Sequence, residues 1–111
     1  GTNHLQVEGG AVAYGDGRVG NHSLSLGVGN VRVFAPDAAL LNFGAGQDFT
    51  LEGWIRIPVG TVRERMTLLD KRDSLTGVGY MAFIEHGRLG MTVTDSSGAT
   101  FTALSMVPSG N

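Results

Sequence analysis

The chain has 111 residues, a formal net charge of −2 and no cysteine. This length suits one domain, residues 1–111, while the lack of cysteine excludes a disulfide scaffold, a zinc–thiolate site and a thiol nucleophile. A net charge this small excludes strong electrostatic attraction to nucleic acid or to an acidic membrane, so we predict neither partner. The 18 glycines and the charged fraction of 16% favour short strands joined by tight turns.

The N-terminal third contains short stretches of alternating residues that predict strands. Residues 4–7 are expected to pair with residues 11–14 across a glycine-containing turn. Residues 23–28 are expected to pair with residues 31–34, because Gly29-Asn30 is a typical two-residue hairpin turn.

Residues 15–20 match the G-x-G-x-x-G pattern of dinucleotide-binding loops, with Asp37 at about the distance of a ribose contact. That function requires a helix after the loop, because the pyrophosphate lies at a helix N-terminus. A strand pattern follows instead at residues 23–26, so we predict a turn-rich loop without nucleotide. Residues 36–43, which begin with Pro-Asp, predict a single helical turn.

Residues 49–59 show the clearest alternation of the chain, with apolar residues at most odd positions. This alternation predicts a half-buried strand. Its orientation is fixed as well, because a slip of one residue would turn the charged Glu52 and Arg56 toward the core. The residues expected to face an inter-sheet core are Phe49, Leu51, Ile55 and Ile57.

The outward face of that predicted strand carries Trp54 between Glu52 and Arg56. An aromatic plane beside a carboxylate and a guanidinium can stack on a sugar and hydrogen-bond its hydroxyl groups, so these three residues form a candidate carbohydrate site. The competing interpretation, which we favour, is that Trp54 packs under a loop or over the Arg56 stem while the charges are solvated.

The C-terminal half predicts a series of hairpins. Turns are expected at His86-Gly87, where the backbone must tolerate positive φ, and at Asp95–Gly98. Residues 60–65 and 73–79 are expected to be long loops. The strands are expected at residues 66–71, around Met81 and Phe83, at residues 89–94 and at residues 99–106.

Chemistry-bearing residues are sparse. No serine lies in a G-x-S-x-G motif, the three histidines are well separated, and no strand carries paired acids. We therefore predict no catalytic residues and no enzymatic activity. Turn aspartates could supply oxygen ligands to calcium, but aspartate is also an ordinary turn residue, and we predict no metal site and no cofactor. These aspartates are Asp16, Asp37, Asp48, Asp70, Asp73 and Asp95.

Several stretches resemble, in order, the laminin-G-like or concanavalin A-like lectin/glucanase family. The most specific stretch is residues 48–55, Asp-Phe-Thr-Leu-Glu-Gly-Trp-Ile, which is similar to the Phe-Thr-aliphatic-x-small-Trp strand of that family. The resemblance covers about residues 18–106 and implies an antiparallel two-sheet β-sandwich, a jelly roll of about eight or nine strands, used for carbohydrate and protein binding. The Glu-x-Asp acid motif of the glucanases is absent, so the resemblance does not imply hydrolysis. The other matching stretches are residues 20–26, 31–33, 40–44, 67–71 and 79–89.

The last predicted strand is expected to leave an open sheet edge, because members of that family continue into further hairpins. No ionisable side chain follows Asp95, and an uncharged apolar edge is unusual where a strand faces water. We therefore predict that residues 99–107 contact a second copy of the chain or another protein surface. The expected interface residues are Phe101, Leu104, Met106 and Val107.

In its small size, low charge and lack of cysteine, the chain also resembles the small jelly-roll decoration, or staple, proteins of tailed-phage capsids. That resemblance implies a structural protein of the virion surface whose partner is a capsid subunit. The alternative is an extracellular lectin or adhesion module that binds glycan. We favour the structural function because a sugar site usually has several exposed aromatic residues, whereas aromatic residues are 7% of this chain.

Overall fold

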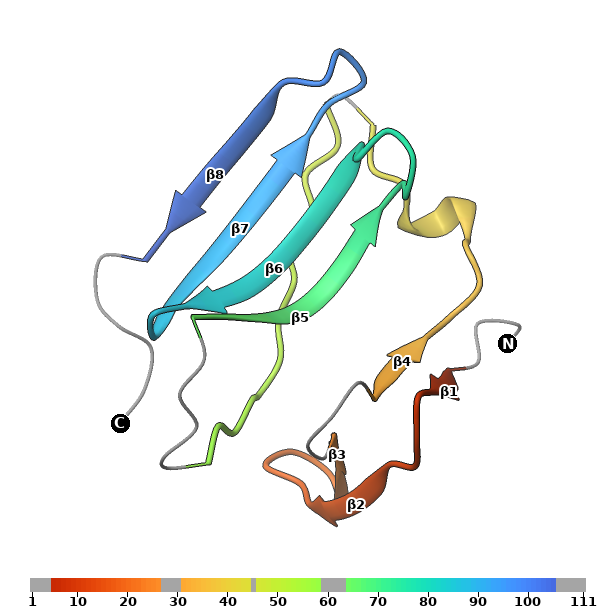
Figure 1. Cartoon of the computed structure of the whole chain (residues 1–111), viewed down its shortest axis with the longest axis vertical. Coiled ribbons are helices and arrows are strands. Elements are labelled where there is room, and N and C mark those ends of the chain that lie inside the picture. The colour runs from red at the N-terminus through yellow and green to blue at the C-terminus, as the bar shows by residue number, and fades with distance from the viewer. Residues whose placement is uncertain (1–4, 27–30, 45, 59–63, 106–111) are drawn as a thin grey trace. The chain divides into compact units, whose positions relative to one another are not determined.

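The computed structural model describes residues 5–26, 31–44, 46–58 and 64–105. Within these residues the chain is all-β apart from one short 3-10 turn, as predicted. Its strands form two two-stranded sheets and one four-stranded sheet, and every pair is antiparallel (Figure 1). The chain divides into two compact units, residues 1–56 and residues 57–111.

The N-terminal unit contains the two small sheets. In one, β1 (Gln6–Glu8) pairs with β4 (Arg32–Phe34), and in the other, β2 (Ala13–Asp16) pairs with β3 (His22–Ser25). The predicted partners were therefore wrong: β1 does not pair with β2, and β3 does not pair with β4. The predicted turn at residues 29–30 lies outside the described residues.

Side-chain contacts accompany the observed pairing. Glu8 lies opposite Arg32 in the β1–β4 register and forms an ion pair with it. The β2–β3 hairpin is closed by the Ser23 hydroxyl, which donates to the Asp16 carbonyl over 2.9 Å. In its loop a Cβ at Gly17 would lie 2.7 Å from the His22 carbonyl oxygen, so only glycine fits. The glycine motif thus forms a hairpin loop followed by a strand, as predicted.

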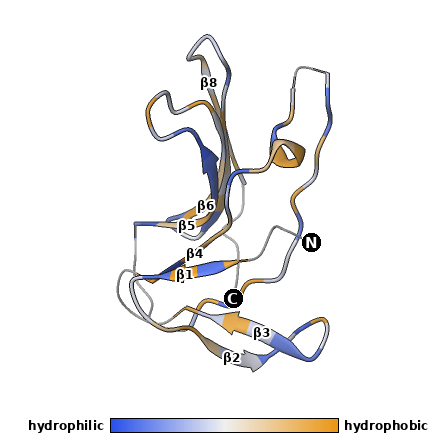
Figure 2. Ribbon diagram, turned by 90° about the vertical axis from the view of Figure 1, so that its right-hand side faces the viewer, coloured by the Kyte–Doolittle hydropathy of each residue, from blue (hydrophilic) through white to orange (hydrophobic). Residues whose placement is uncertain are grey.

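One turn of 3-10 helix, Ala39–Leu41, confirms the helical turn predicted for residues 36–43. It is hydrophobic throughout (Figure 2). Residues 46–58, in contrast, contain no strand, although residues 49–59 showed the clearest strand pattern. Alternation makes a segment suitable for a sheet, but a ladder also requires a partner strand, and no described strand pairs with this segment.

The predicted core residues of that segment are correspondingly misplaced. Leu51, Ile55 and Ile57 are exposed, and Phe49 is only half-buried. The Phe49 ring stacks on the Phe43 ring, with centroids 4.4 Å apart and planes 9° from parallel. This local aromatic contact replaces the predicted inter-sheet packing. Residue 59 lies outside the described residues.

The C-terminal unit is a four-stranded sheet in the order β5-β6-β7-β8 (Figure 1). Its strands confirm those predicted for this half of the chain. The His86-Gly87 turn has φ of 47° and 75°, as expected for a tight hairpin. The strand bounds are Arg65–Arg72 for β5, Gly79–Glu85 for β6, Arg88–Thr94 for β7 and Thr100–Leu104 for β8.

The central strand β6 holds every side chain that is buried among the described residues. The two-residue turn pairs even positions of β6 with odd positions of β7, so Tyr80 and Ile84 share a face with Val93 and Leu89. We call this the apolar face. Lys71, opposite Tyr80, also lies on this face. The other members are Met66, Leu69, Tyr80, Ala82, Ile84, Leu89, Met91, Val93, Phe101 and Ala103.

The opposite face, here the threonine face, carries Met81 and Phe83 among polar residues. Phe83 is fully buried there, and the Arg65 guanidinium lies over its ring, 4.3 Å from the ring centroid. Gly90, directly across from Phe83, leaves room for the ring. The threonines of this face are Thr67, Thr92, Thr94, Thr100 and Thr102.

Candidate functional site

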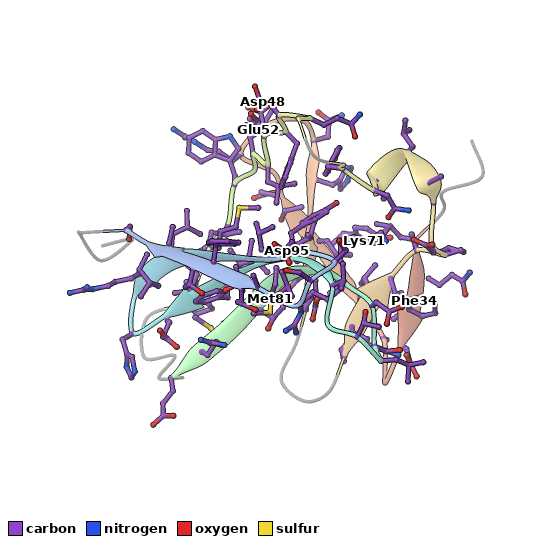
Figure 3. All side chains as sticks on the ribbon, turned by 90° about the horizontal axis from the view of Figure 1, so that it is seen from above. Phe34, Asp48, Glu52, Lys71, Met81 and Asp95 are labelled. Atoms are coloured by element: carbon purple, nitrogen blue, oxygen red, sulfur yellow. The ribbon has the colours of Figure 1, made fainter. Side chains whose placement is uncertain are left out.

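The first candidate site is an open hollow in the N-terminal unit around Trp54. It has a volume of about 470 Å³ and is lined by Val19, Glu52, Gly53 and Trp54. The β2–β3 loop supplies Val19, and the extended segment 46–58 supplies the other three residues. Glu52 projects outward from this segment (Figure 3). Gly53 has no side chain to fill the hollow, and a Cβ there would meet nothing within 4 Å.

One side of the Trp54 indole is occupied by a cation. The Arg18 guanidinium lies 5.1 Å from the ring centroid, a distance typical of a cation–π contact. Trp54 is nevertheless 69% exposed, so part of the indole faces solvent. A planar apolar surface that contacts a guanidinium and lines the same hollow as the Glu52 carboxylate has the chemistry needed to stack on a sugar and hydrogen-bond it.

The structure brings together two of the three residues of the predicted sugar site. Trp54 and Glu52 line the hollow, whereas Arg56 is not among its lining residues. The arginine that contacts the Trp54 ring is Arg18, whereas the sequence-based interpretation placed this ring over the Arg56 stem. No sequence pattern connects Arg18 with Trp54, because their proximity depends on tertiary structure and not on strand spacing.

The second candidate site is the outer edge of β8. Phe101 is 63% exposed and Leu104 is 42% exposed, consistent with the exposure that an interface would need. The other two predicted interface residues, Met106 and Val107, lie outside the described residues. β8 itself carries no charged side chain.

The opposite edge strand, β5, differs from β8 in its charge and regularity. Arg65 forms an ion pair with Glu85 at 2.8 Å, and Arg72 forms one with Asp70 at 2.7 Å. The hydrogen bond from Arg72 holds the pKa of Asp70 below its usual range. A register shift between Thr67 and Leu69 also interrupts the ladder. Charges and bulges are the usual means by which sheet edges avoid pairing.

Two aspartates organise the loops at one end of the four-stranded sheet. Asp73 accepts hydrogen bonds from the Leu75 and Thr76 amides at 2.9 and 2.8 Å, and the Thr76 amide is the main cause of its lowered pKa. Asp95 accepts from the Ser97 hydroxyl at 2.6 Å, which is the main cause of its lowered pKa. Both carboxylates therefore act as turn residues, as predicted.

No group of three histidine, aspartate or glutamate side chains is close enough to hold a metal ion in the part of the chain that the structure describes. Over the same residues, no helix is long and apolar enough to cross a membrane. Comparison of the chain with models of protein families, with curated proteins and with solved structures found no match.

Proposed function

We propose that this chain is a non-enzymatic structural protein that clamps neighbouring protein surfaces, as a decoration subunit on a virion capsid. The observation that carries this proposal is the uncharged β8 edge with its exposed Phe101 and Leu104. An unprotected edge strand accepts a further strand through main-chain hydrogen bonds, and exposed apolar side chains add contact area.

The finer architecture that we propose is a two-sheet sandwich of the jelly-roll type. Its support is the apolar face of the four-stranded sheet, which would be suited to packing against a second layer. Several side chains on this face are exposed, so a covering layer would stabilise the sheet by burying them. The exposed members are Leu69, Leu89, Val93 and Phe101.

The proposed location is tested by immunogold electron microscopy with an antibody against the chain. The sample is purified virions of the virus that encodes the chain. We expect gold particles on the capsid surface. Pre-incubation of the antibody with excess purified chain is the control and should remove the gold. Unlabelled virions, with the chain detected only in fractions free of particles, would contradict the proposal.

The alternative function, glycan binding as an extracellular lectin or adhesion module, rests on the hollow around Trp54. It is tested on a glycan array with the wild-type chain and with Trp54→Ala. Tyr14→Ala is the matched control, because Tyr14 is an exposed aromatic residue that does not line the hollow. Glycan binding that is lost only in Trp54→Ala would favour this alternative over the structural function.

A further inference from the structure

The backbone of β8 has one hydrogen-bonded side and one open side. The Ser105 amide donates to the Leu89 carbonyl over 2.8 Å, and the Asp95 amide donates to the Ala99 carbonyl over 2.9 Å. Because backbone groups alternate along an antiparallel strand, Phe101 and Ala103 also direct theirs toward β7. The amides and carbonyls of the intervening Thr100, Thr102 and Leu104 therefore point away from β7, where no described strand pairs with them.

We infer that this open edge pairs antiparallel with the β8 strand of a second copy, around a two-fold axis at Thr102. The inference rests on the proposed function and names one partner of its interface. In this register Thr102 faces Thr102 of the second copy, and Thr100 faces its Leu104. Each of the three facing pairs would exchange two main-chain hydrogen bonds, and the two four-stranded sheets would become continuous.

Charge favours a second copy of β8 as the occupant. A β8 strand brings no charge to the seam, so two copies meet without repulsion between like charges. A β5 strand would instead bring Arg65, Asp70 and Arg72 to the seam, together with its bulge. Among the described edges of the four-stranded sheet, only β8 combines an uncharged sequence with a regular ladder.

Side-chain size is also self-complementary in this register. Phe101 of one copy lies directly across from Ala103 of the second copy on the apolar face, and the axis repeats this pair. Facing residues whose backbones are not hydrogen-bonded to each other have the closest Cα atoms, so a large side chain is best accommodated beside a small one. The pairing would cover the exposed Phe101 ring and extend the apolar face across both copies.

The test is sedimentation velocity of the full chain over a range of concentrations. We expect a monomer–dimer equilibrium in the wild type, and at least about a tenfold weaker dimer in Thr102→Lys, because two lysines would face each other at the axis. The matched control is Thr67→Lys, another exposed threonine of the threonine face, but on β5. It should leave the dimer within about twofold of the wild type.

A second measurement keeps the inference testable if Thr102→Lys does not fold. The chain contains no cysteine, so Thr102→Cys places a single thiol at the expected axis, and mild oxidation should produce covalent dimers. Thr67→Cys should remain monomeric under the same conditions. A wild type that is monomeric at every concentration, or equal cross-linking of both variants, would overturn the inference.

Binding to purified virions separates this inference from the proposed function. If the wild type is monomeric but binds virions, and Thr102→Lys does not, β8 contacts a capsid subunit: the inference is wrong and the proposed function stands. If the wild type dimerises through Thr102 but neither form binds virions, the inference stands and the proposed function is wrong.

Discussion

At the scale of single residues, Gly90 is a position where neighbouring side chains leave the four-stranded sheet little room for a Cβ atom. A Cβ there would lie 2.4 and 2.5 Å from carbons of the Phe83 ring and 2.8 Å from the Leu104 side chain. We therefore predict that Gly90→Ala lowers the free energy of unfolding by about 1–3 kcal/mol through overpacking. Urea denaturation measures the change. Gly53→Ala is the control, because its Cβ would meet nothing within 4 Å, and an equal loss in both variants would contradict this reason.

The loop aspartates predict how stability depends on pH. Hydrogen bonds from the loops lower the pKa of Asp73 and Asp95 in the folded state, so these groups stabilise the fold above their unfolded pKa of about 3.9. This stability should be lost as the pH falls through the lower, folded pKa values. We expect Asp73→Asn/Asp95→Asn to be less stable than the wild type at pH 7 and the difference to shrink at pH 3.

Urea denaturation at both pH values makes this comparison. Asp48→Asn is the control for loss of a negative charge, because Asp48 lies on the extended segment and not in either loop. A stability difference between the double variant and the wild type that is the same at pH 7 and pH 3 would show that the carboxylate charges do not contribute.

At the scale of elements, β6 determines the stability of the four-stranded sheet, because it pairs on both sides and carries the buried side chains. We predict that Ile84→Ala lowers the free energy of unfolding by about 2–5 kcal/mol, the usual cost of a large-to-small change in a core. Leu75→Ala is the control, because Leu75 is 93% exposed in the β5–β6 loop, and its change should stay within about 0.5 kcal/mol. Equal effects of both variants, measured by urea denaturation, would contradict the central role of β6.

The elements also show where sequence-based prediction succeeded. β6, β7 and β8 are joined by tight turns whose residues carry their own signals, such as His86-Gly87 with its positive φ. Such hairpins are local, so alternation and turn chemistry are sufficient to predict them. The pairing of β1 with β4, in contrast, joins residues distant in sequence, such as Glu8 and Arg32, which no local pattern predicts. The β2–β3 hairpin is local, but the Gly29-Asn30 turn signal favoured a different partner for β3.

The candidate sites follow the same division. The β8 edge could be predicted, because the lack of charge is a property of one continuous stretch. The hollow around Trp54 could be predicted only in part, because Trp54 and Glu52 are close in sequence while Arg18 and Val19 come from a distant loop. Residues 49–58 have the strand pattern but no ladder, because alternation specifies faces and does not supply a partner.

At the scale of the whole molecule, the two units differ in how much they bury. None of the described residues of the N-terminal unit has a buried side chain, and its strands form only two-stranded sheets. Two-stranded sheets alone are marginally stable in water. The C-terminal unit combines four strands with the buried residues of β6. The resistance of the backbone to local opening should therefore be concentrated in the C-terminal unit.

We predict that amide hydrogen exchange of the intact chain reports this difference. Amides of β6 and the facing amides of β7 should exchange at least about a hundredfold more slowly than those of β1 to β4, because opening them requires disruption of the buried cluster. The Thr102 amide provides an internal comparison, since it points away from β7: it should exchange rapidly in dilute monomer and slowly where β8 pairs with a second copy. Equal protection in β2–β3 and β6–β7 would show that the N-terminal unit is stabilised as strongly as the four-stranded sheet, and that the buried residues of β6 do not determine the order of opening.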